Sequence, residues 1–188
     1  MDKDVSAGST TTIVGRLALA VTLLAAGLGY TGVLNDVTAS DTASLARYVG
    51  GVALFAAGLM AFRDRDTVGG TAFAALGALW FTWAGLSGAQ AASGNAAGLF
   101  LLLFALVALS LTFAGGDMLG QGMYGLLFVS LVLLAVAAFA DNGTIAKIGG
   151  WFAVVAGAVA WYAATAAFAH WPMTMPRRTA GRRMTVTG

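Results

Sequence analysis

The chain of 188 residues has no cysteine, no glutamate, a single histidine and only 10% charged residues. The absence of cysteine excludes disulfides, thiolate metal sites and cysteine nucleophiles. An enzyme inside a membrane needs a nucleophile with its base, metal ligands or an acid/base pair. His170 lies beside Trp171 near the end of the chain, where an interfacial role is expected. We therefore expect no catalytic residue, no metal and no cofactor, and a protein that is not an enzyme.

The chain is rich in long stretches of apolar residues. Hydrophobic residues make up 59% of it, the mean hydropathy is +0.84, and between Thr67 and Ala146 only Asp117 and Asp141 carry charge. About 20 apolar helical residues cross a bilayer core that is about 30 Å thick. Six stretches meet this requirement: 13–34, 45–62, 71–92, 96–114, 122–140 and 148–169. The predicted fold is an all-α integral membrane protein, a six-transmembrane-helix bundle at 13–169, with tails at 1–12 and 170–188.

Basic residues predict the orientation. With six spans, one side of the membrane holds eight of them and the other side holds only Arg47 and Lys147. An excess of Lys and Arg in short loops marks the cytoplasmic face. We expect both termini to be cytoplasmic and the protein to be multi-pass in the cell (plasma or inner) membrane. Arg16 lies one turn inside the first span, where we expect it to snorkel to the interface. The net charge of +2 gives no sign of nucleic-acid binding.

Glycine is the other abundant residue, with 26 copies against two prolines. Small residues let membrane helices approach closely. Gly58 and Gly157, each preceded by alanine in a Gly/Ala-rich span, are predicted helix crossings. Inside the spans the polar groups are otherwise mainly hydroxyls, whose ordinary role is to hydrogen-bond between helices.

The second and third spans carry a recognisable motif. In order, it reads Gly50-Gly51, Ala57-Gly58, Phe62-Arg63, Thr67, Gly69, Thr71-Ala72-Phe73, Gly77 and Trp80. The pattern resembles the acetate uptake transporter family, which includes bacterial acetate/succinate permeases and fungal ammonia/acetate relatives. The resemblance continues at Ser130-Leu131 and in the sixth span. The family's NPAPLGL opening falls on residues 10–16, where only Gly15 matches, so the chain is identified as a divergent member.

The resemblance implies a path through each protomer of a homohexamer in the lipid bilayer. The family narrows this path with residues of the first, third and fifth spans, and the matching pore-constriction positions are Leu19, Leu76 and Leu131. Other positions expected on the substrate path are Thr22, Thr71, Phe73, Trp80 and Ser130.

Three functions stay open at this point. The resemblance implies a transporter or channel for a small monocarboxylate such as acetate, either proton-coupled or carried as the neutral acid. A neutral-solute pore of the ammonia type suits an apolar throat without titratable groups. A membrane scaffold with a closed path fits the lost motif. Because we expect no fixed cation along the path, an anion would be desolvated there at a cost of several kcal/mol or more. The coupling ion, direction and gating are not determined by the sequence.

Overall fold

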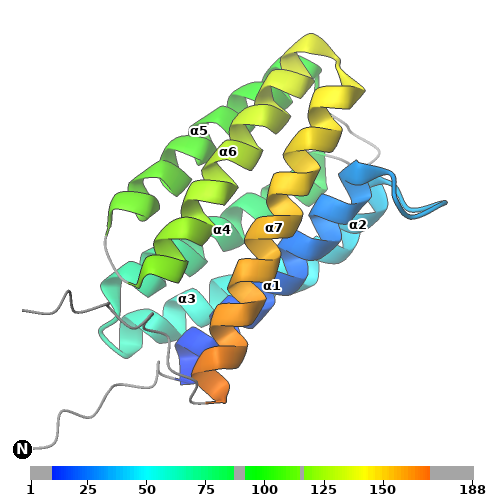
Figure 1. Ribbon diagram of the computed structural model, residues 1–188. Helices are drawn as coiled ribbons and strands as arrows, with labels where there is room; N and C mark the ends of the chain where they lie inside the picture. The colour runs from blue at the N-terminus through cyan, green and yellow to red at the C-terminus, as the bar shows by residue number, and fades with distance from the viewer. Residues whose placement is uncertain (1–9, 87–91, 115–116, 170–188) are drawn as a thin grey trace, which may run out of the picture.

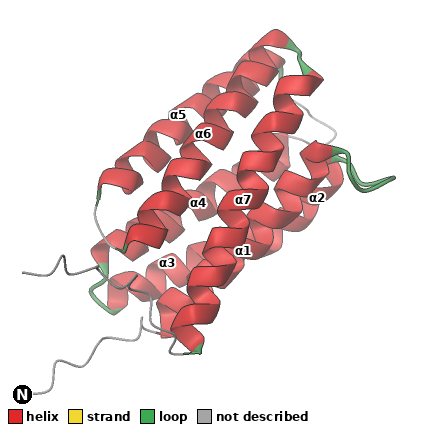
Figure 2. Cartoon of the chain, viewed as in Figure 1, coloured by secondary structure: helices red, strands yellow, loops and turns green. Residues whose placement is uncertain are grey.

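The computed structural model describes residues 10–86, 92–114 and 117–169, and these residues form helices and short loops without a strand (Figures 1 and 2). The elements are α1 (Thr10–Thr31), α2 (Ala39–Ala46), the π-helix η1 (Arg47–Ala53), α3 (Leu54–Arg63), α4 (Thr67–Leu86), α5 (Gly94–Phe113), α6 (Met118–Ala140) and α7 (Gly143–Phe168). Because α2, η1 and α3 are continuous, there are six helices of 20 to 26 residues that are apolar enough to span a membrane. The predicted six-helix membrane fold is confirmed. Of the predicted tails at 1–12 and 170–188, residues 1–9 and 170–188 lie outside the described residues, whereas residues 10–12 belong to α1.

The six spans form a ring. α1 packs on α7, α7 on α6 and α6 on α5, while α1 also packs on α2, η1 and α3, which cover α4. A small contact between α4 and α5 closes the ring. Among the described helices, no Cα atom of α1 lies within 8 Å of one of α6, so the backbones of these two helices lie apart on different sides of the interior. Figure 1 shows that the start of α1 and the end of α7 lie at the same end of the bundle.

Side-chain caps set where several helices begin. Thr38 and Asp41 form a capping box at α2, and Ser93 and Asn142 accept backbone N–H bonds at the starts of α5 and α7. Asp117 accepts the N–H of Gly120 at the start of α6. Such caps satisfy N–H groups that have no partner within the helix. The cap therefore holds the Asp117 carboxylate at the end of the bundle where α1 starts.

The predicted close crossings are confirmed. A Cβ on Gly58 would lie 2.5 Å from the backbone nitrogen of Ala74 on α4, and one on Gly157 would lie 2.9 Å from that of Leu24 on α1. Real Cβ atoms do not approach backbone this closely. The helix pairs α3/α4 and α1/α7 thus touch through glycine.

Gly157→Val should lower the melting temperature of the purified protein. The added side chain must push α7 away from α1, and overpacking of this kind costs about 1–3 kcal/mol. Gly122→Val is the matched control, because no atom lies within 4 Å of a Cβ built there on α6. Fluorescence-detected gel filtration after heating measures the melting temperature of both variants. Equal losses in the two variants would mean that helix propensity, and not the crossing, accounts for the effect.

The second span contains a π-helix that the sequence does not reveal. η1 includes Gly50 and Gly51 and widens the helix in the middle of the span. A Cβ on Gly50 would meet Thr22 of α1 and Trp80 of α4, both within 3 Å. Single π turns disturb the regular hydrogen-bond ladder and recur at functional sites. Here the widened turn lies against two residues that were expected on the substrate path.

Candidate functional site: a line of cavities through the bundle

Three cavities follow one another through the ring. The first, which we call the Arg16 vestibule, has a volume of about 200 Å³ and lies at the end where α1 starts; it is lined by Thr12, Arg16, Asp66, Val68, Gly69, Phe73, Asp117, Gly120, Met123 and Tyr124. The second, the central cavity, has a volume of about 20 Å³. The third, the Asp141 vestibule, has a volume of about 190 Å³ and includes Asp141, Asn142 and Ala146. The central cavity and the Asp141 vestibule share Tyr30, Trp83, Leu101 and Leu134.

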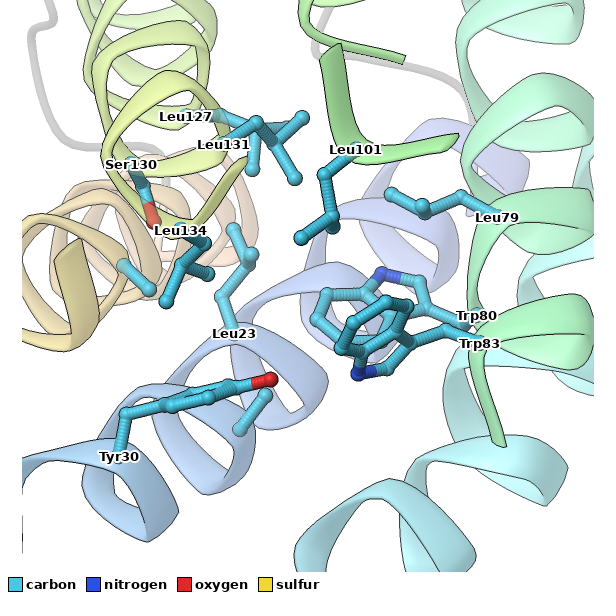
Figure 3. Close-up of a pocket in the computed structure, with 12 residues that line it drawn as sticks. Leu23, Tyr30, Leu79, Trp80, Trp83, Leu101, Leu127, Ser130, Leu131 and Leu134 are labelled. Carbon is cyan, nitrogen blue, oxygen red and sulfur yellow. The ribbon is translucent and has the colours of Figure 1, made fainter. Parts of the chain in front are cut away.

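The central cavity is small and almost wholly apolar. Its volume is about that needed to hold one water molecule, and no acidic or basic side chain lines it apart from the phenol of Tyr30. Leucines from α1, α4, α5 and α6 surround it, as Figure 3 shows. A solute that passes this point must therefore leave nearly all of its hydration water behind.

Four side chains with a polar atom line the central cavity: Tyr30, Trp80, Trp83 and Ser130 (Figure 3). Ser130 donates its hydroxyl to the carbonyl of Gly149 at 2.8 Å, and Tyr30 is hydrogen-bonded to the indole of Trp83. Trp80 differs from both. Its side chain is only 7% exposed, and its Nε1 is buried with no hydrogen-bond partner. Buried polar atoms are nearly always hydrogen-bonded, so this N–H is available to a ligand that accepts a hydrogen bond.

Apolar side chains fill the bundle between the Arg16 vestibule and the central cavity. On α1, Leu19 lies one turn after Arg16 and one turn before Leu23 of the central cavity. On α4, Leu76 lies in the same way between Phe73 and Trp80. Both leucines are 0% exposed. They belong, with Leu127 and Met123 of α6, to one packed cluster.

The structure places the three predicted constriction residues on different helices of this cluster. Leu19 lies on α1, Leu76 on α4 and Leu131 on α6. Leu131 lines the central cavity, whereas Leu19 and Leu76 lie at the level where the Arg16 vestibule ends. The three positions are thus adjacent along the line of cavities.

Of the five other predicted path residues, three line one of the three cavities and two line none of them. Phe73 lines the Arg16 vestibule, and Trp80 and Ser130 line the central cavity. Thr22 is buried but donates to the carbonyl of Ala18 and packs against Gly50 of η1. Thr71 is exposed on α4, where its hydroxyl donates to Thr67, and it lines none of the three cavities.

The ion-pair partner of Arg16 was not predicted from the sequence. Its Nη2 lies 2.6 Å from Oδ1 of Asp117, across the Arg16 vestibule. The Arg16 vestibule therefore contains a fixed cation, whereas the sequence led us to expect none along the path. Both residues come near span ends on the same predicted side of the membrane, and this is the one sequence signal that could have suggested the pair. Among the described residues, no group of three His, Cys, Asp or Glu side chains could hold a metal ion.

These features define a class: a six-span helical membrane protein with cavities aligned through its ring of helices. The chain belongs to the GPR1/FUN34/yaaH family, whose model matches residues 7–176. This result confirms the resemblance found in the motif of the second and third spans.

Individual relatives agree with the family assignment. The chain is 30% identical to ammonia transport outward protein 2 of Saccharomyces cerevisiae over 137 residues, which cover 66% of this chain but only 49% of that protein. It is 31% identical to the succinate-acetate/proton symporter SatP of Escherichia coli over 127 residues, or 62% of this chain and 66% of that protein. The structure of the bacterial acetate channel SatP has the same fold, with a TM-score of 0.78 at 24% identity, covering 87% of this chain and 93% of that one. All three are named for transport, in agreement with the expectation that this chain is not an enzyme.

Proposed function

We propose that this protein forms a membrane path for a small monocarboxylate of the acetate type. The solute crosses the leucine-lined central cavity as the neutral acid. The observation that carries the proposal is the central cavity. It shares wall residues with the Asp141 vestibule and, apart from the phenol of Tyr30, has no acidic or basic side chain in its wall. A carboxylate stripped of water in such surroundings is disfavoured by several kcal/mol or more, whereas the protonated acid is not. The names of the SatP relatives support acetate as the substrate class.

The buried donor of Trp80 supports the same substrate. A neutral carboxylic acid has a carbonyl oxygen that accepts a hydrogen bond, and Nε1 of Trp80 has no partner within the protein. A site built to hydrogen-bond a substrate group selects strongly against molecules that lack it. The cavity thus offers the acid one polar contact in an otherwise apolar passage.

Acetate uptake into proteoliposomes tests the proposal. At fixed total acetate, the initial protein-dependent rate should rise about tenfold for each unit by which the pH falls, for as long as the ionised form predominates. Protein-free liposomes from the same lipid supply the background of unassisted acid entry. A protein-dependent rate that follows the membrane potential and is indifferent to pH would show that the anion itself crosses.

Ammonia is the second candidate, and one feature of the vestibules favours it. The Arg16 vestibule contains two carboxylates, Asp66 and Asp117, against one guanidinium, and the Asp141 vestibule contains Asp141. Counted by formal side-chain charge alone, both vestibules are net negative, which favours cations such as ammonium, and neutral ammonia suits an apolar path. Its uptake would rise with pH, opposite to that of the acid. If no solute shows protein-dependent flux, the closed-path scaffold is the remaining function.

We propose a closed cyclic homo-oligomer, most simply the homohexamer that the family resemblance implies. Identical heterologous contacts close into rings, and the chain presents many large apolar side chains on the outside of α3 and α5. Native mass spectrometry in mild detergent should show a six-fold species at micromolar concentration. Observation of monomer alone would overturn the proposed assembly and leave the fold unaffected.

We also propose that both termini are cytoplasmic and that the protein resides in the cell membrane. Thr11 at the start of α1 donates to the carboxylate of Asp64, so Arg63 and Arg65 lie at the same end as the start of α1. The excess of basic residues is therefore at that end, which marks it as cytoplasmic. Because the chain has no cysteine, Asp36→Cys in the α1–α2 loop provides a single thiol. An impermeant maleimide should label it in intact cells, while Arg65→Cys should be labelled only after lysis. The reverse pattern would invert the orientation.

A further inference from the structure

The ion pair at the mouth of the path joins two helices whose backbones are not neighbours in the ring. Arg16 belongs to α1, and Asp117 caps α6 on the opposite side of the Arg16 vestibule. Their side chains are 20% and 36% exposed, and Nη2 and Oδ1 are 2.6 Å apart. The pair is therefore in contact with the space through which a solute must pass to reach Phe73 and the throat.

The two carboxylate oxygens of Asp117 accept hydrogen bonds from different donors. Oδ1 accepts from Arg16, while Oδ2 accepts the backbone N–H of Gly120 at 3.2 Å. The cap holds Asp117 in place whether or not Arg16 is bound to it. Arg16, by contrast, is a guanidinium whose planar set of donors matches any carboxylate. Partly exposed ion pairs are weak, so a second carboxylate in the vestibule can compete for Arg16.

The other charges of the vestibule do not prevent an anion from binding there. Besides Arg16 and Asp117, the wall contains the carboxylate of Asp66. Oδ1 of Asp66 accepts the N–H of Gly69 at 2.8 Å, at the start of α4. A carboxylate at a helix N-terminus is offset by the partial positive charge of that terminus. The same holds for Asp117 at α6, and this leaves the guanidinium as the group that favours an incoming anion.

We propose that Arg16 is the recruiting site for the carboxylate group of the permeant, and that Asp117 is the resident counter-ion which the permeant replaces. This inference rests on the proposed monocarboxylate function. The carboxylate leaves Arg16 as it takes up a proton from hydronium in the vestibule, and the guanidinium is then free to pair with Asp117 again. The neutral acid so formed passes Phe73. Asp117 stays on its cap and turns toward solvent. The site distinguishes small carboxylates from uncharged solutes of the same size at entry.

Binding to the purified protein tests the site without transport. The probe is ¹³C-acetate, whose NMR line width is followed as a function of its concentration. Asp117→Asn removes the competing charge and keeps the cap, because Asn is as good an N-cap as Asp; it should tighten acetate binding several-fold. Arg16→Gln should weaken binding several-fold, and Arg16→Lys should retain most of it. Arg63→Gln is the matched control, since Arg63 is an exposed cation at the same end and lines none of the three cavities.

The double variant Arg16→Gln/Asp117→Asn decides between the site and a general charge effect. If Asp117 acts by occupying Arg16, its substitution should have no further effect once Arg16 is gone. The inference is overturned if Asp117→Asn tightens binding equally in both backgrounds, or if Arg63→Gln weakens binding as much as Arg16→Gln. Should wild-type protein bind acetate in this way yet show no flux in proteoliposomes, the proposed function fails while the recruiting site stands.

Discussion

Leu76→Ala combined with Leu131→Ala should raise the flux of small monocarboxylates several-fold and weaken the discrimination against bulkier acids. Leu76 lies where the Arg16 vestibule ends, and Leu131 lines the central cavity beyond it. Each substitution removes three heavy atoms from an apolar passage. The wider passage admits water, which lowers the cost of entry. Leu131→Ala alone should act in the same direction with a smaller effect.

The same burial that leads us to expect these leucines to act as a barrier also makes them part of the core. Leu76 is 0% exposed and Leu131 is 3% exposed, so each truncation should cost about 2–5 kcal/mol of folding free energy. Leu54→Ala is the matched control for Leu131→Ala, because Leu54 is equally buried on α3 but, unlike Leu131, lines none of the three cavities. It should lower the melting temperature without raising flux.

Initial uptake of acetate and of a bulkier acid, at matched amounts of assembled protein, measures the effect. A well-assembled double variant with unchanged flux and unchanged size preference would show that these leucines are not the barrier. A similar gain of flux in Leu54→Ala would attribute the effect to general loosening of the bundle.

Trp80→Phe should reduce acetate flux about tenfold while leaving the protein at least as stable as the wild type. The substitution keeps an aromatic ring in the central cavity and removes the Nε1 donor, which is buried without a partner. An unsatisfied buried donor costs about 1–3 kcal/mol of folding free energy, so its removal should stabilise the protein when no substrate is bound. The permeant acid loses its hydrogen bond, and a bond of about 1.4 kcal/mol corresponds to a factor of about ten.

Trp83→Phe is the control for this prediction. Trp83 lines the same cavity, but its indole is already bonded to Tyr30. Its replacement should lower the melting temperature, because the hydrogen bond to Tyr30 is lost. The proposed role of Trp80 is contradicted if Trp80→Phe transports acetate at the wild-type rate, or if its flux falls only in proportion to a loss of stability.

The sequence determined the membrane class, the six spans and the close glycine crossings. These properties follow from local quantities, because apolar length fixes how many helices can cross a bilayer and the absence of a Cβ fixes how closely two helices can approach. The motif around Trp80 was also sufficient to place the chain in its family. None of these conclusions requires knowledge of which residues meet in space.

The tertiary structure alone decided which side chains face the interior. In a membrane the outer surface of a helix is as apolar as the inner one, so hydrophobic periodicity does not mark the buried face. For this reason Tyr30 and Trp83 could be missed although they line two cavities. The motif that placed Thr71 on the path likewise gave no sign of its exposure. The pairing of Arg16 with Asp117 joins residues 101 positions apart. It arises only because the ring of helices brings the start of α1 opposite the start of α6.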